Sequence, residues 1–532
     1  MTHRIHLRTH FIGCCTILVL IASGSIAGDI EVIFSEAPGH PTAQVPGAKD
    51  LAGNPATTEF KALETLSVSP DGSYWIVKGR NWLGSDLETM LLLGSGATGD
   101  MLGQEGQPIP DGAAGELYDF FGSSPAWFND LNQFCFTARA RGGDPDTKQK
   151  GLFFDGTNFT IVRMESDPAL GLIDLPPNPS GDELFGNSFG SMHVLNDGTF
   201  GYHDATIKNI HTSRRPAVFY NDTAFQQCGL PPTLGGGSWE GMDANTFWTT
   251  PDGGTWTLQG DDTMDDEHDD ILVVNDAVVL REGNPIPGTS IQVAAVFHTK
   301  LLTNGYWYSR GDDPADNDWA VINGALVAAT GDPIIAGSTE HWAAVFQAFA
   351  GNTAGDWVLA GRTDNPDTAA DEVLVLNGTT IIAREGDPID LDGNGQFDDD
   401  AFIGRGVNTN SAFHPDDLWL TADMWIYFFV SLRNAAGEDL GSFGTGGDAF
   451  LRVQAGGPGC PNPGASGYYC TADLDANCEI NISDLAALLS TYGMCPGDPG
   501  YIAAADLTDD GNPCIAIADL ATLLGQYNDV CH

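Results

Sequence analysis

The sequence predicts a mainly β protein, a seven-bladed β-propeller-like repeat domain followed by a small α-helical C-terminal domain. Two landmarks that recur in phase through the body of the chain indicate the propeller, and a loop-helix unit that occurs twice near the C-terminus indicates the helical domain. We expect a leader (1–27), the repeat domain (28–455), a Gly- and Pro-containing linker (456–469) and the C-terminal domain (470–532).

The N-terminus predicts export. Arg4 and Arg8 precede an apolar run from residue 12 to 22, and residues 25 to 27 (Ser-Ile-Ala) offer a small-x-small cleavage site before Gly28. This is the pattern of a secretory signal peptide, and the run is too short to span a membrane. We therefore expect a secreted protein, extracellular or associated with the cell surface, without membrane insertion.

The first landmark is a turn containing Gly, Asp or Asn that is followed by an aromatic strand. Its aromatic residues follow one another at intervals of 50 to 66 residues, and a recurring period of this kind indicates a repeat architecture. We expect the tryptophans among them at equivalent positions in successive blades, packed between neighbouring sheets. The seven residues are Trp75, Phe134, Phe200, Trp256, Trp307, Trp357 and Trp419.

The second landmark is a Glu-Gly-x-Pro-like motif that follows a pair of short apolar strands in each of the first six units. Asn377-Gly378 separates one such pair, and this dipeptide favours a two-residue hairpin turn. Each unit thus holds about four short strands, as a propeller blade does. The motifs end at Pro108, Pro168, Pro231, Pro285, Pro333 and Pro388.

The seventh unit lacks this motif and stops after residues 450 to 453 (Phe-Leu-Arg-Val). A candidate for the missing strand lies at residues 30 to 34, and we expect these two segments to pair. A strand from the other end of the chain closes the ring and removes exposed sheet edges. Six or eight blades, or an open array, also fit the spacing, and a pair of β-sandwiches is the competing fold.

The repeat domain resembles secreted bacterial repeat proteins that carry an Arg-Glu-Gly-Asp-Pro-like motif. The motif stands at residues 281 to 285 (Arg-Glu-Gly-Asn-Pro) and at residues 384 to 388 (Arg-Glu-Gly-Asp-Pro). The resemblance covers most of residues 30 to 455, and it implies repeat architecture more than any activity.

Two copies of a loop-helix unit predict calcium sites in the C-terminal domain. The first loop places oxygen ligands at positions 1, 3, 5, 9 and 12 and a backbone carbonyl at position 7, as a 12-residue calcium loop requires. The helix face that follows it, Leu485, Leu488, Leu489 and Tyr492, recurs 35 residues later. The first-loop candidates are Asp473, Asp475, Asn477, Glu479, Asn481 and Asp484, and the second-loop candidates are Asp506, Asp510 and Asp519, with Thr508 and Asn512 as further ones.

This tail resembles a type I dockerin over residues 468 to 530, an EF-hand-like module of paired calcium loops that end in Asp and lead into an Asp-Leu-x-x-Leu-Leu helix. The resemblance implies calcium as the cofactor and a cohesin-like or cell-surface protein as the partner. The chain departs from the family in Cys478, where the turn favours Gly, and in a second loop two residues longer. Ile482-Ser483 and Ile517-Ala518 replace the polar residues that dockerins usually present to a cohesin.

Six cysteines crowd into the tail. A segment of about 70 residues buries little core, and small exported modules usually rely on disulfides. We expect the six to be oxidised in a pairing that the sequence leaves open; zinc is the competing interpretation, although no C-x-x-C pair occurs. They are Cys460, Cys470, Cys478, Cys495, Cys514 and Cys531, while Cys135 and Cys228 of the repeat domain are either bridged or simply buried.

The charge is one-sided: 22 Lys and Arg stand against 72 Asp and Glu, a net charge of -50. Such a chain repels nucleic acid and anionic membrane surfaces, which excludes them as partners. Three acidic runs recur between the aromatic strand and the next hairpin, at residues 261 to 270, 312 to 318 and 364 to 371. We expect these loops on one face, either as a surface that attracts cations or as solvated insertions.

One loop of the repeat domain also fits a calcium site. It has oxygens at positions 1, 3, 5 and 9, and Gly395 at position 6 permits the tight turn. Position 12 is Ala401, so Asp399 or Asp400 must complete the shell; the competing interpretation is an acidic surface loop. The candidates are Asp390, Asp392, Asn394, Gln396 and Asp398.

Catalytic signatures are weak. Residues 186 to 190 match Gly-x-Ser-x-Gly, but no helix signal follows them, and a nucleophile elbow needs a strand-turn-helix context. We therefore predict a secreted calcium-binding protein, a non-enzymatic binding or scaffold propeller with a docking tail. The alternative is an exported polysaccharide hydrolase or lyase. Convergent carboxylates with aromatic walls at a mouth of the channel favour the enzyme, and a plugged channel favours binding.

Overall fold

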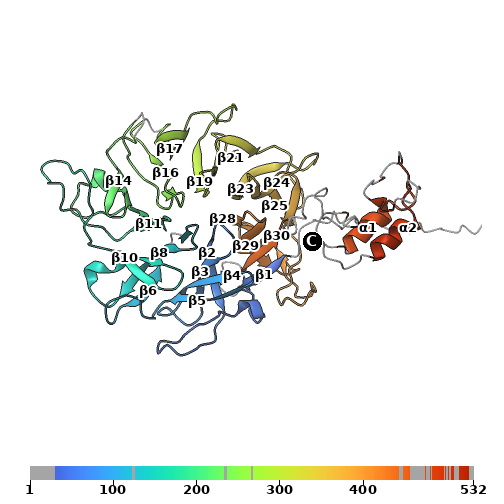
Figure 1. Cartoon of the computed structure of the whole chain (residues 1–532), viewed down its shortest axis with the longest axis horizontal. Helices are drawn as coiled ribbons and strands as arrows, with labels where there is room; N and C mark the ends of the chain where they lie inside the picture. The colour runs from blue at the N-terminus through green and yellow to red at the C-terminus, as the bar shows by residue number, and fades with distance from the viewer. Residues whose placement is uncertain are drawn as a thin grey trace, which may run out of the picture.

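The repeat domain is a seven-bladed β-propeller, as the sequence predicts. In the computed structural model, seven sheets of four or five strands follow one another in a ring (Figure 1). The structure describes residues 30–122, 126–232, 237–264, 268–441 and 447–455, and in the tail residues 472, 474, 480, 482–496, 498, 501, 505–508 and 514–525.

Each blade is an antiparallel sheet, and its strands follow one another outwards from the channel. Blade 1 holds β2 (Phe60–Val68), β3 (Trp75–Asn81), β4 (Thr89–Ser95) and β5 (Thr98–Gln104). Blade 2 holds β6 (Leu117–Phe121), β7 (Trp127–Phe128), β8 (Phe134–Arg141), β9 (Gln149–Phe154) and β10 (Phe159–Met164). Blade 3 holds β11 (Phe189–Val194), β12 (Phe200–Asp204), β13 (Ala217–Tyr220) and β14 (Thr223–Gln227).

The remaining blades repeat this plan. Blade 4 holds β15 (Trp248–Thr249), β16 (Trp256–Asp261), β17 (Asp270–Val274) and β18 (Ala277–Arg281). Blade 5 holds β19 (Ala295–Leu301), β20 (Trp307–Asp312), β21 (Asp318–Ile322) and β22 (Ala325–Ala329). Blade 6 holds β23 (Trp342–Gly351), β24 (Trp357–Thr363), β25 (Glu372–Leu376) and β26 (Thr380–Arg384).

Blade 7 closes the ring between the two ends of the domain. It holds β27 (Phe402–Ile403), β28 (Phe413–Leu420), β29 (Trp425–Arg433), β30 (Gly447–Gln454) and, from the N-terminus, β1 (Glu31–Ser35). Val32 pairs with Leu451 and Phe34 with Phe450, which confirms the predicted closure. The Phe34 ring lies 5.6 Å from that of Trp75 in blade 1, so the N-terminal strand also joins blades 7 and 1.

Three short 3-10 helices lie in the connections of the propeller, at Pro41–Ala43, Pro145–Thr147 and Thr212–Arg214. The described residues of the tail contain two α-helices, α1 (Ile482–Ser490) and α2 (Ile517–Gly525). Both lie outside the ring (Figure 1). Neither has the length and apolar character that a membrane-spanning helix needs, and the described residues hold no longer helix.

The aromatic landmark marks the first residue of the strand that pairs with the innermost strand in six blades. Trp75 begins β3 and packs 5.1 Å from Phe450 of blade 7, and Trp256 begins β16 and packs 5.0 Å from Phe225 of blade 3. The predicted packing between neighbouring sheets is thus confirmed at these two positions. Phe134, Phe200, Trp307 and Trp357 begin β8, β12, β20 and β24.

The seventh landmark was assigned to the wrong tryptophan. Trp419 lies in the innermost strand β28, and Trp425 begins β29. The turn between these strands lies at residues 421 to 424, where Met424 has a φ of +66°. The Asp416-Asp417 pair resembles a turn in sequence, but it lies in a bulge of β28.

The Glu-Gly-x-Pro-like motif forms the connection from one blade to the next. Its second residue has a positive φ, such as +79° at Gly106 and +73° at Gly283, a conformation that glycine adopts readily. Its backbone N–H donates to the segment that enters the next blade, as from Gly106 to the carbonyl of Tyr118 at 2.8 Å. The motif therefore recurs because every blade needs the same exit turn.

Carboxylates also join neighbouring blades, in contacts that we call inter-blade latches. In each latch a carboxylate of one blade accepts a backbone N–H of the next blade. The donor lies in the innermost strand or in the residue just before it. Asp270 accepts from Val296 at 3.1 Å, Glu372 from Ala412 at 2.6 Å, and Glu36, which follows β1, from Leu63 at 2.7 Å. Asp318 accepts from Phe346 in the same way.

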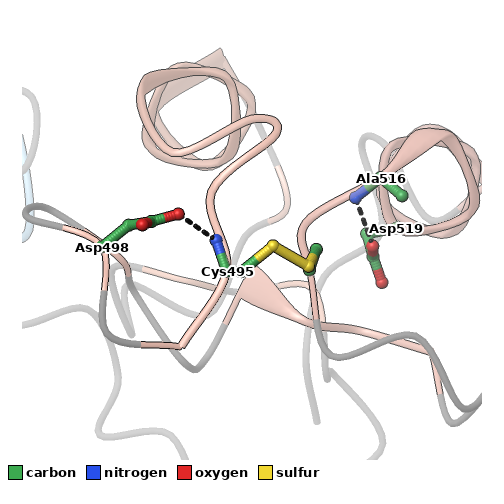
Figure 2. Close-up of a disulfide and its surroundings, with 5 residues drawn as sticks. Cys495, Asp498, Ala516 and Asp519 are labelled. Atoms are coloured by element: carbon green, nitrogen blue, oxygen red, sulfur yellow. Dashed lines mark hydrogen bonds between the residues drawn. A yellow bond between two sulfur atoms is a disulfide. The ribbon is translucent and has the colours of Figure 1, made fainter.

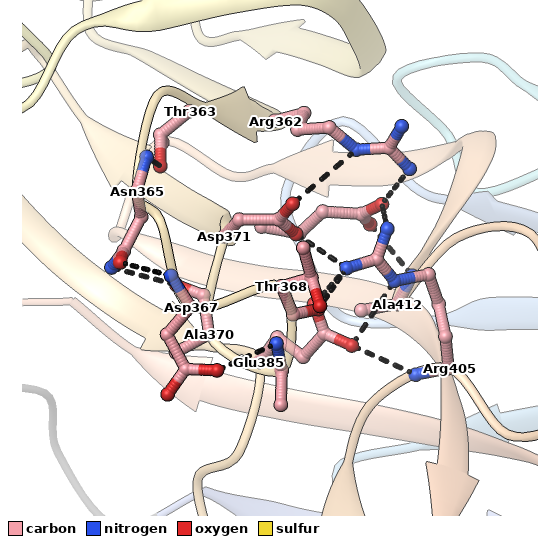
Figure 3. Close-up of polar contacts among 12 residues, drawn as sticks. Arg362, Thr363, Asn365, Asp367, Thr368, Ala370, Asp371, Glu385, Arg405 and Ala412 are labelled. Atoms are coloured by element: carbon pink, nitrogen blue, oxygen red, sulfur yellow. Dashed lines mark hydrogen bonds and ion pairs between the residues drawn. The ribbon is translucent and has the colours of Figure 1, made fainter.

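The latch between blades 6 and 7 belongs to a wider ionic network (Figure 3). Arg405 donates to Glu385 at 2.8 Å and also to Asp371, the last residue of one acidic run. Arg362 donates to Glu372 at 2.9 Å. Part of the acidity that the sequence assigns to exposed loops is therefore buried between blades and paired with arginine.

Candidate functional site

The strongest candidate site is a cavity in the central channel. Its volume of about 410 Å³ lies within the roughly 300 to 1,000 Å³ of typical small-ligand sites. Residues of β2, β7, β15, β19 and β28 line it, so five blades contribute. We call it the central chamber, and its lining includes Glu64, Trp127, Trp248, Phe297, His298, Lys300, Asp416, Asp417 and Trp419.

Three tryptophans close one end of the chamber. The rings of Trp127 and Trp248 stack with centroids 4.3 Å apart, and Trp419 lies 5.6 Å from Trp127. The indole N–H of Trp248 donates to the carbonyl of Asn245, and that of Trp419 to the carbonyl of Leu66. Trp127 and Trp419 also line a second, much smaller cavity of about 50 Å³, so they form the partition between the two cavities.

The chamber lies on the face that carries the acidic runs. The smaller cavity is lined by the turns that follow the innermost strands, such as residues 69 to 70 and 421 to 422. The chamber therefore lies towards the opposite face, where the second and third strands of each blade connect. The acidic runs form these connections in blades 4, 5 and 6, as the sequence predicts, so they surround the chamber side of the ring.

A β-bulge brings two carboxylates into the chamber. The pairing of β28 with β29 shifts register between Phe413 and Leu418, and Asp416 has a φ of +63°. Bulges re-aim side chains near functional sites, and a non-glycine residue in this conformation points to a functional hypothesis. The bulge places Asp416 beside blade 5, two blades away along the ring.

Blade 5 meets Asp416 with three nitrogen-bearing side chains. Arg310 binds both carboxylate oxygens, at 3.0 and 2.9 Å, and His298 Nδ1 lies 3.5 Å from one of them. The ammonium of Lys300 donates to the carbonyls of Asp416 at 3.2 Å and Leu418 at 3.0 Å. It also lies 4.1 Å from the centroid of the Trp419 ring, a cation–π contact.

The two neighbouring carboxylates differ in protonation. Burial raises the pKa of Asp417 to about 7, although its carboxylate accepts the N–H of Leu66 at 2.9 Å. Burial also acts to raise the pKa of Asp416, but His298 and Arg310 outweigh it, so this pKa lies below the usual value. Burial lowers the pKa of His298 to about 4 and that of Lys300 to about 8.

Glu64 is the third carboxylate of the chamber. Lys78 lies 2.8 Å from it, and Arg80 contacts its other oxygen. Glu64 and Asp416 thus each have cationic partners. The chamber thus places three carboxyl groups and aromatic walls in one lining, and Trp127 and Trp419 stand between it and the smaller cavity.

The calcium loop predicted in the propeller joins blade 6 to blade 7. Ligand atoms of Asp390, Asp392 and Asp399 lie within 4.8 Å of one another, so Asp399, rather than Asp400, lies beside the first two candidates. Asp400 instead accepts the N–H of Ala435. Asn394 Nδ2 donates to Asp398 at 3.4 Å, and Gln396 Nε2 donates to the carbonyl of Gly395. Asp398 is not one of the three clustered carboxylates.

The same kind of hydrogen bond is described in each of the two predicted loops of the tail. The carboxylates of Asp484 and Asp519, the last ligand candidates, are buried and accept the N–H of Leu474 at 2.6 Å and of Leu507 at 2.9 Å. Thr508 also donates to Asp519, and Asp506 lies in the same loop. Asp473, Asp475, Asn477, Glu479, Asn481, Asp510 and Asn512 lie outside the described residues.

One disulfide supports the tail. Cys495 and Cys514 are bonded across a separation of 19 residues, next to α2, where Asp519 accepts the N–H of Ala516 at 2.8 Å (Figure 2). This confirms the oxidised state for one pair. Cys460, Cys470, Cys478 and Cys531 lie outside the described residues, and among the described cysteines Cys135 and Cys228 are buried and free.

The residues of the chamber carry almost no signal in the sequence. Trp127, Trp248, His298 and Lys300 lie in innermost strands, which do not repeat between blades. The stretch from residue 416 to 419 (Asp-Asp-Leu-Trp) stands out in the sequence, but its composition predicts a turn rather than a site. Ser188, of the Gly-x-Ser-x-Gly match, precedes strand β11, so no nucleophile elbow forms there.

No family model and no curated protein matches the chain. Among solved structures it is similar to the polysaccharide lyase Uly1, with 12% identity and a TM-score of 0.35 over 74% of this chain and 89% of that one. It is also similar to a eukaryotic initiation factor, with 8% identity and a TM-score of 0.33 over 81% and 96%. An oligogalacturonate lyase in complex with manganese gives 13% identity and a TM-score of 0.27 over 50% and 67%. At these TM-scores none of the likenesses bears on the function of this chain.

Proposed function

We propose that the protein is an exported, non-enzymatic polysaccharide-binding propeller with a calcium-dependent docking tail. The observation that carries the binding function is the central chamber, where three tryptophans and the half-exposed Phe297 stand beside fixed polar groups. Ligand sites typically combine apolar and aromatic walls with a few such groups. Sugars match this lining because each ring has apolar C–H faces and a hydroxyl-bearing edge.

Binding is favoured over catalysis because the ionised groups of the chamber are already engaged. Arg310 holds both oxygens of Asp416, and Lys78 and Arg80 hold Glu64. A bidentate guanidinium pair fixes its carboxylate in place. Asp416 and Glu64 therefore stabilise the shape of the chamber and are poorly placed to attack a glycosidic bond.

A polysaccharide panel tests the binding function. The full chain, with calcium, is incubated with polysaccharides while bound protein and released sugar are measured together. We expect binding without release. Phe297→Ala should weaken binding about tenfold or more, because Phe297 lines the chamber and is 48% exposed. Trp82→Ala, at an aromatic residue that is 45% exposed and outside the chamber lining, is the matched control; equal losses in both variants contradict the proposal.

An exported hydrolase or lyase is the second candidate, and one observation favours it. Asp416 and Asp417 are neighbours whose pKa values are shifted in opposite directions, a pattern found where one carboxyl acts as an acid and another as a base. In that case sugar is released in the same panel. Asp417→Asn then abolishes release and leaves binding in place, whereas the binding proposal predicts no release from the parent protein.

The tail is proposed to bind calcium through its two loops, and thereby to dock the propeller to a cohesin-like or cell-surface protein. Asp506 Oδ1 is buried and has no hydrogen-bond partner among the described residues, which fits a metal ligand. After Arg452 the chain contains no Lys or Arg, so no lysine or arginine of the tail neutralises its carboxylates. A bound calcium ion supplies this neutralisation and links binding to folding.

The acidic loop of the propeller is proposed as a further calcium site. Asp390, Asp392 and Asp399 form its carboxylate group, and His40 Nδ1 lies 3.7 Å from Asp399. Thr42 donates to the carbonyl of Leu391, so the loop is fastened to the segment that follows the closing strand. Asp390→Asn should reduce the calcium stoichiometry of the full chain by one ion without changing the calcium response of the tail.

Export and docking are tested on the producing cells. The mature protein should begin at Gly28, which N-terminal sequencing of the exported protein measures. A chelator should release it from the cell surface if the tail docks through calcium. Retention that is unchanged by the chelator contradicts calcium-dependent docking, and an N-terminus at Met1 contradicts export by this leader.

A further inference from the structure

We propose that the central chamber admits the end of a neutral saccharide chain and excludes internal segments and charged sugars. This inference rests on the proposed binding function and adds to it the class of ligand and the mode of entry. Two separate observations support it. The partition at one end of the chamber indicates the mode of entry, and the pairing of the charged groups indicates the class of ligand.

The mode of entry follows from the partition. Trp127 and Trp419 separate the central chamber from the small cavity at the other end of the channel. The stacked pair of Trp127 and Trp248 adds to this wall, and the ring of Trp248 is buried to 2% exposure. An internal segment needs two openings because the chain continues on both sides of it. A chamber closed at one end accepts only a terminus.

Negatively charged saccharides meet two obstacles. The net charge of the chain is -50, and the acidic runs of blades 4 to 6 lie on the chamber side of the ring, so the field repels polyanions before contact. Inside, Lys300 donates to two backbone carbonyls and faces the Trp419 ring, and Arg310 is occupied by Asp416. A uronate carboxylate therefore meets no cation that lacks a partner in this lining.

Positively charged saccharides are attracted by the net charge of the chain, but inside the chamber they find the groups that bind cations already occupied. The Trp419 face that attracts a cation already holds the ammonium of Lys300 at 4.1 Å. The carboxylates of Asp416 and Glu64 are paired with Arg310, Lys78 and Arg80. Asp417, the remaining carboxyl of the lining, already accepts the N–H of Leu66 at 2.9 Å, and its burial disfavours the ionised form. An amino sugar thus adds a charge beside Lys300 without gaining a carboxylate that is held ready for it, and burial of a charge without a partner is unfavourable. A neutral terminus avoids both penalties.

Calorimetric titration of the full chain tests the ligand class and the mode of entry. The probes are linear malto-, cello-, laminari-, xylo- and manno-oligosaccharides, with oligogalacturonate and glucosamine oligomers as the charged probes. We expect one of the neutral series to bind at least about tenfold more tightly than either charged oligomer. A charged oligomer that binds as tightly as the best neutral one overturns the neutral class.

The stoichiometry of that series decides between end and internal binding. A short oligomer and a much longer chain of the same sugar should each bind one protein per chain. A number of proteins that grows with chain length overturns end binding and leaves the proposed binding function intact. Failure of every neutral and charged probe to bind overturns the proposed function itself, so the two failures are distinguishable. Phe297→Ala should weaken the titration about tenfold or more, with Trp82→Ala unchanged.

Discussion

The propeller and the tail show two ways of holding an acidic chain together. In the propeller, buried carboxylates such as Glu36 and Glu372 accept backbone N–H groups of the next blade, and arginines pair with Glu372, Asp371 and Glu385. In the tail, Asp484 and Asp519 are as deeply buried, and after Arg452 the chain has no Lys or Arg to pair with them. The propeller is thus stabilised by packing and internal pairing, whereas the described part of the tail is cross-linked by a disulfide and is proposed to bind calcium.

The hydrophobic cores also differ: the core of the propeller is large, and that of the tail is small. Each propeller blade packs against two neighbours, and one buried cluster alone extends over blades 5, 6 and 7. The described core of the tail consists of six small or aliphatic residues: Ala472, Ile480, Leu488, Ala505, Ile515 and Leu523. A core of this size supplies little free energy of unfolding, and small domains of this kind usually rely on cross-links such as the Cys495–Cys514 disulfide. Four predictions test this contrast.

The largest effect is expected for Phe34→Ala in the closing strand. Phe34 is 6% exposed and contacts Phe60 and Trp75 of blade 1, and removal of a buried phenylalanine typically costs about 3 to 5 kcal/mol. In calorimetry of the full chain, the propeller transition should fall while the tail transition stays. Leu51→Ala, at a residue that is 64% exposed, is the control. Equal shifts of both transitions contradict separate stabilisation.

The double substitution Cys495→Ser and Cys514→Ser should destabilise the tail and leave the propeller unaffected. This disulfide closes a separation of 19 residues, and loss of such a cross-link typically costs about 2 to 4 kcal/mol. We expect the tail transition to fall and the propeller transition to remain. If the tail transition does not change, the disulfide is not needed and the small core stabilises the tail without it.

Calcium should raise the tail transition. At a hundredfold excess over Kd, one site contributes about 2.7 kcal/mol. Asp473→Ala should weaken this response more than Asp506→Ala, because the first loop matches the calcium-loop spacing better. The measurement is the calcium-dependent shift in Tm of the tail transition. Equal responses in the parent and both variants refute the tail as a calcium module.

The smallest effect is expected in the pH dependence of the ring closure. Burial and the nearby Asp448 raise the pKa of Glu36 to about 9. The stabilisation from Glu36 is therefore complete below its unfolded pKa and is lost as the pH rises through its folded pKa. Glu36→Gln keeps the shape and the acceptor, so the propeller Tm should decline less between roughly pH 5 and 9 than in the parent. Glu59→Gln is the control, and parallel declines in parent and Glu36→Gln argue against the assignment.

Most of the fold was predictable because each blade uses similar residues at the same two turns. The turn before Trp75, Trp256, Trp307 and Trp357 and the exit turn at Gly106 or Gly283 recur, since every blade needs one tight turn and one exit. The closing strand was predictable from the motif missing in the last unit. Trp419 was misassigned because a bulge and a turn share the same Asp-rich composition.

The sequence by itself predicted the repeat architecture, the ring closure and the spacing of the proposed calcium ligands, because these depend on local turns and on periods along the chain. Seven blades were the favoured count, and the structure decided it against six or eight. Only the tertiary structure decided the central chamber. Trp127, Trp248, His298 and Trp419 come from four different blades and meet on one axis. The bulge at Asp416 acquires its role only when Arg310 faces it across the channel. Such a site depends on distances between blades, which no periodicity along the chain encodes.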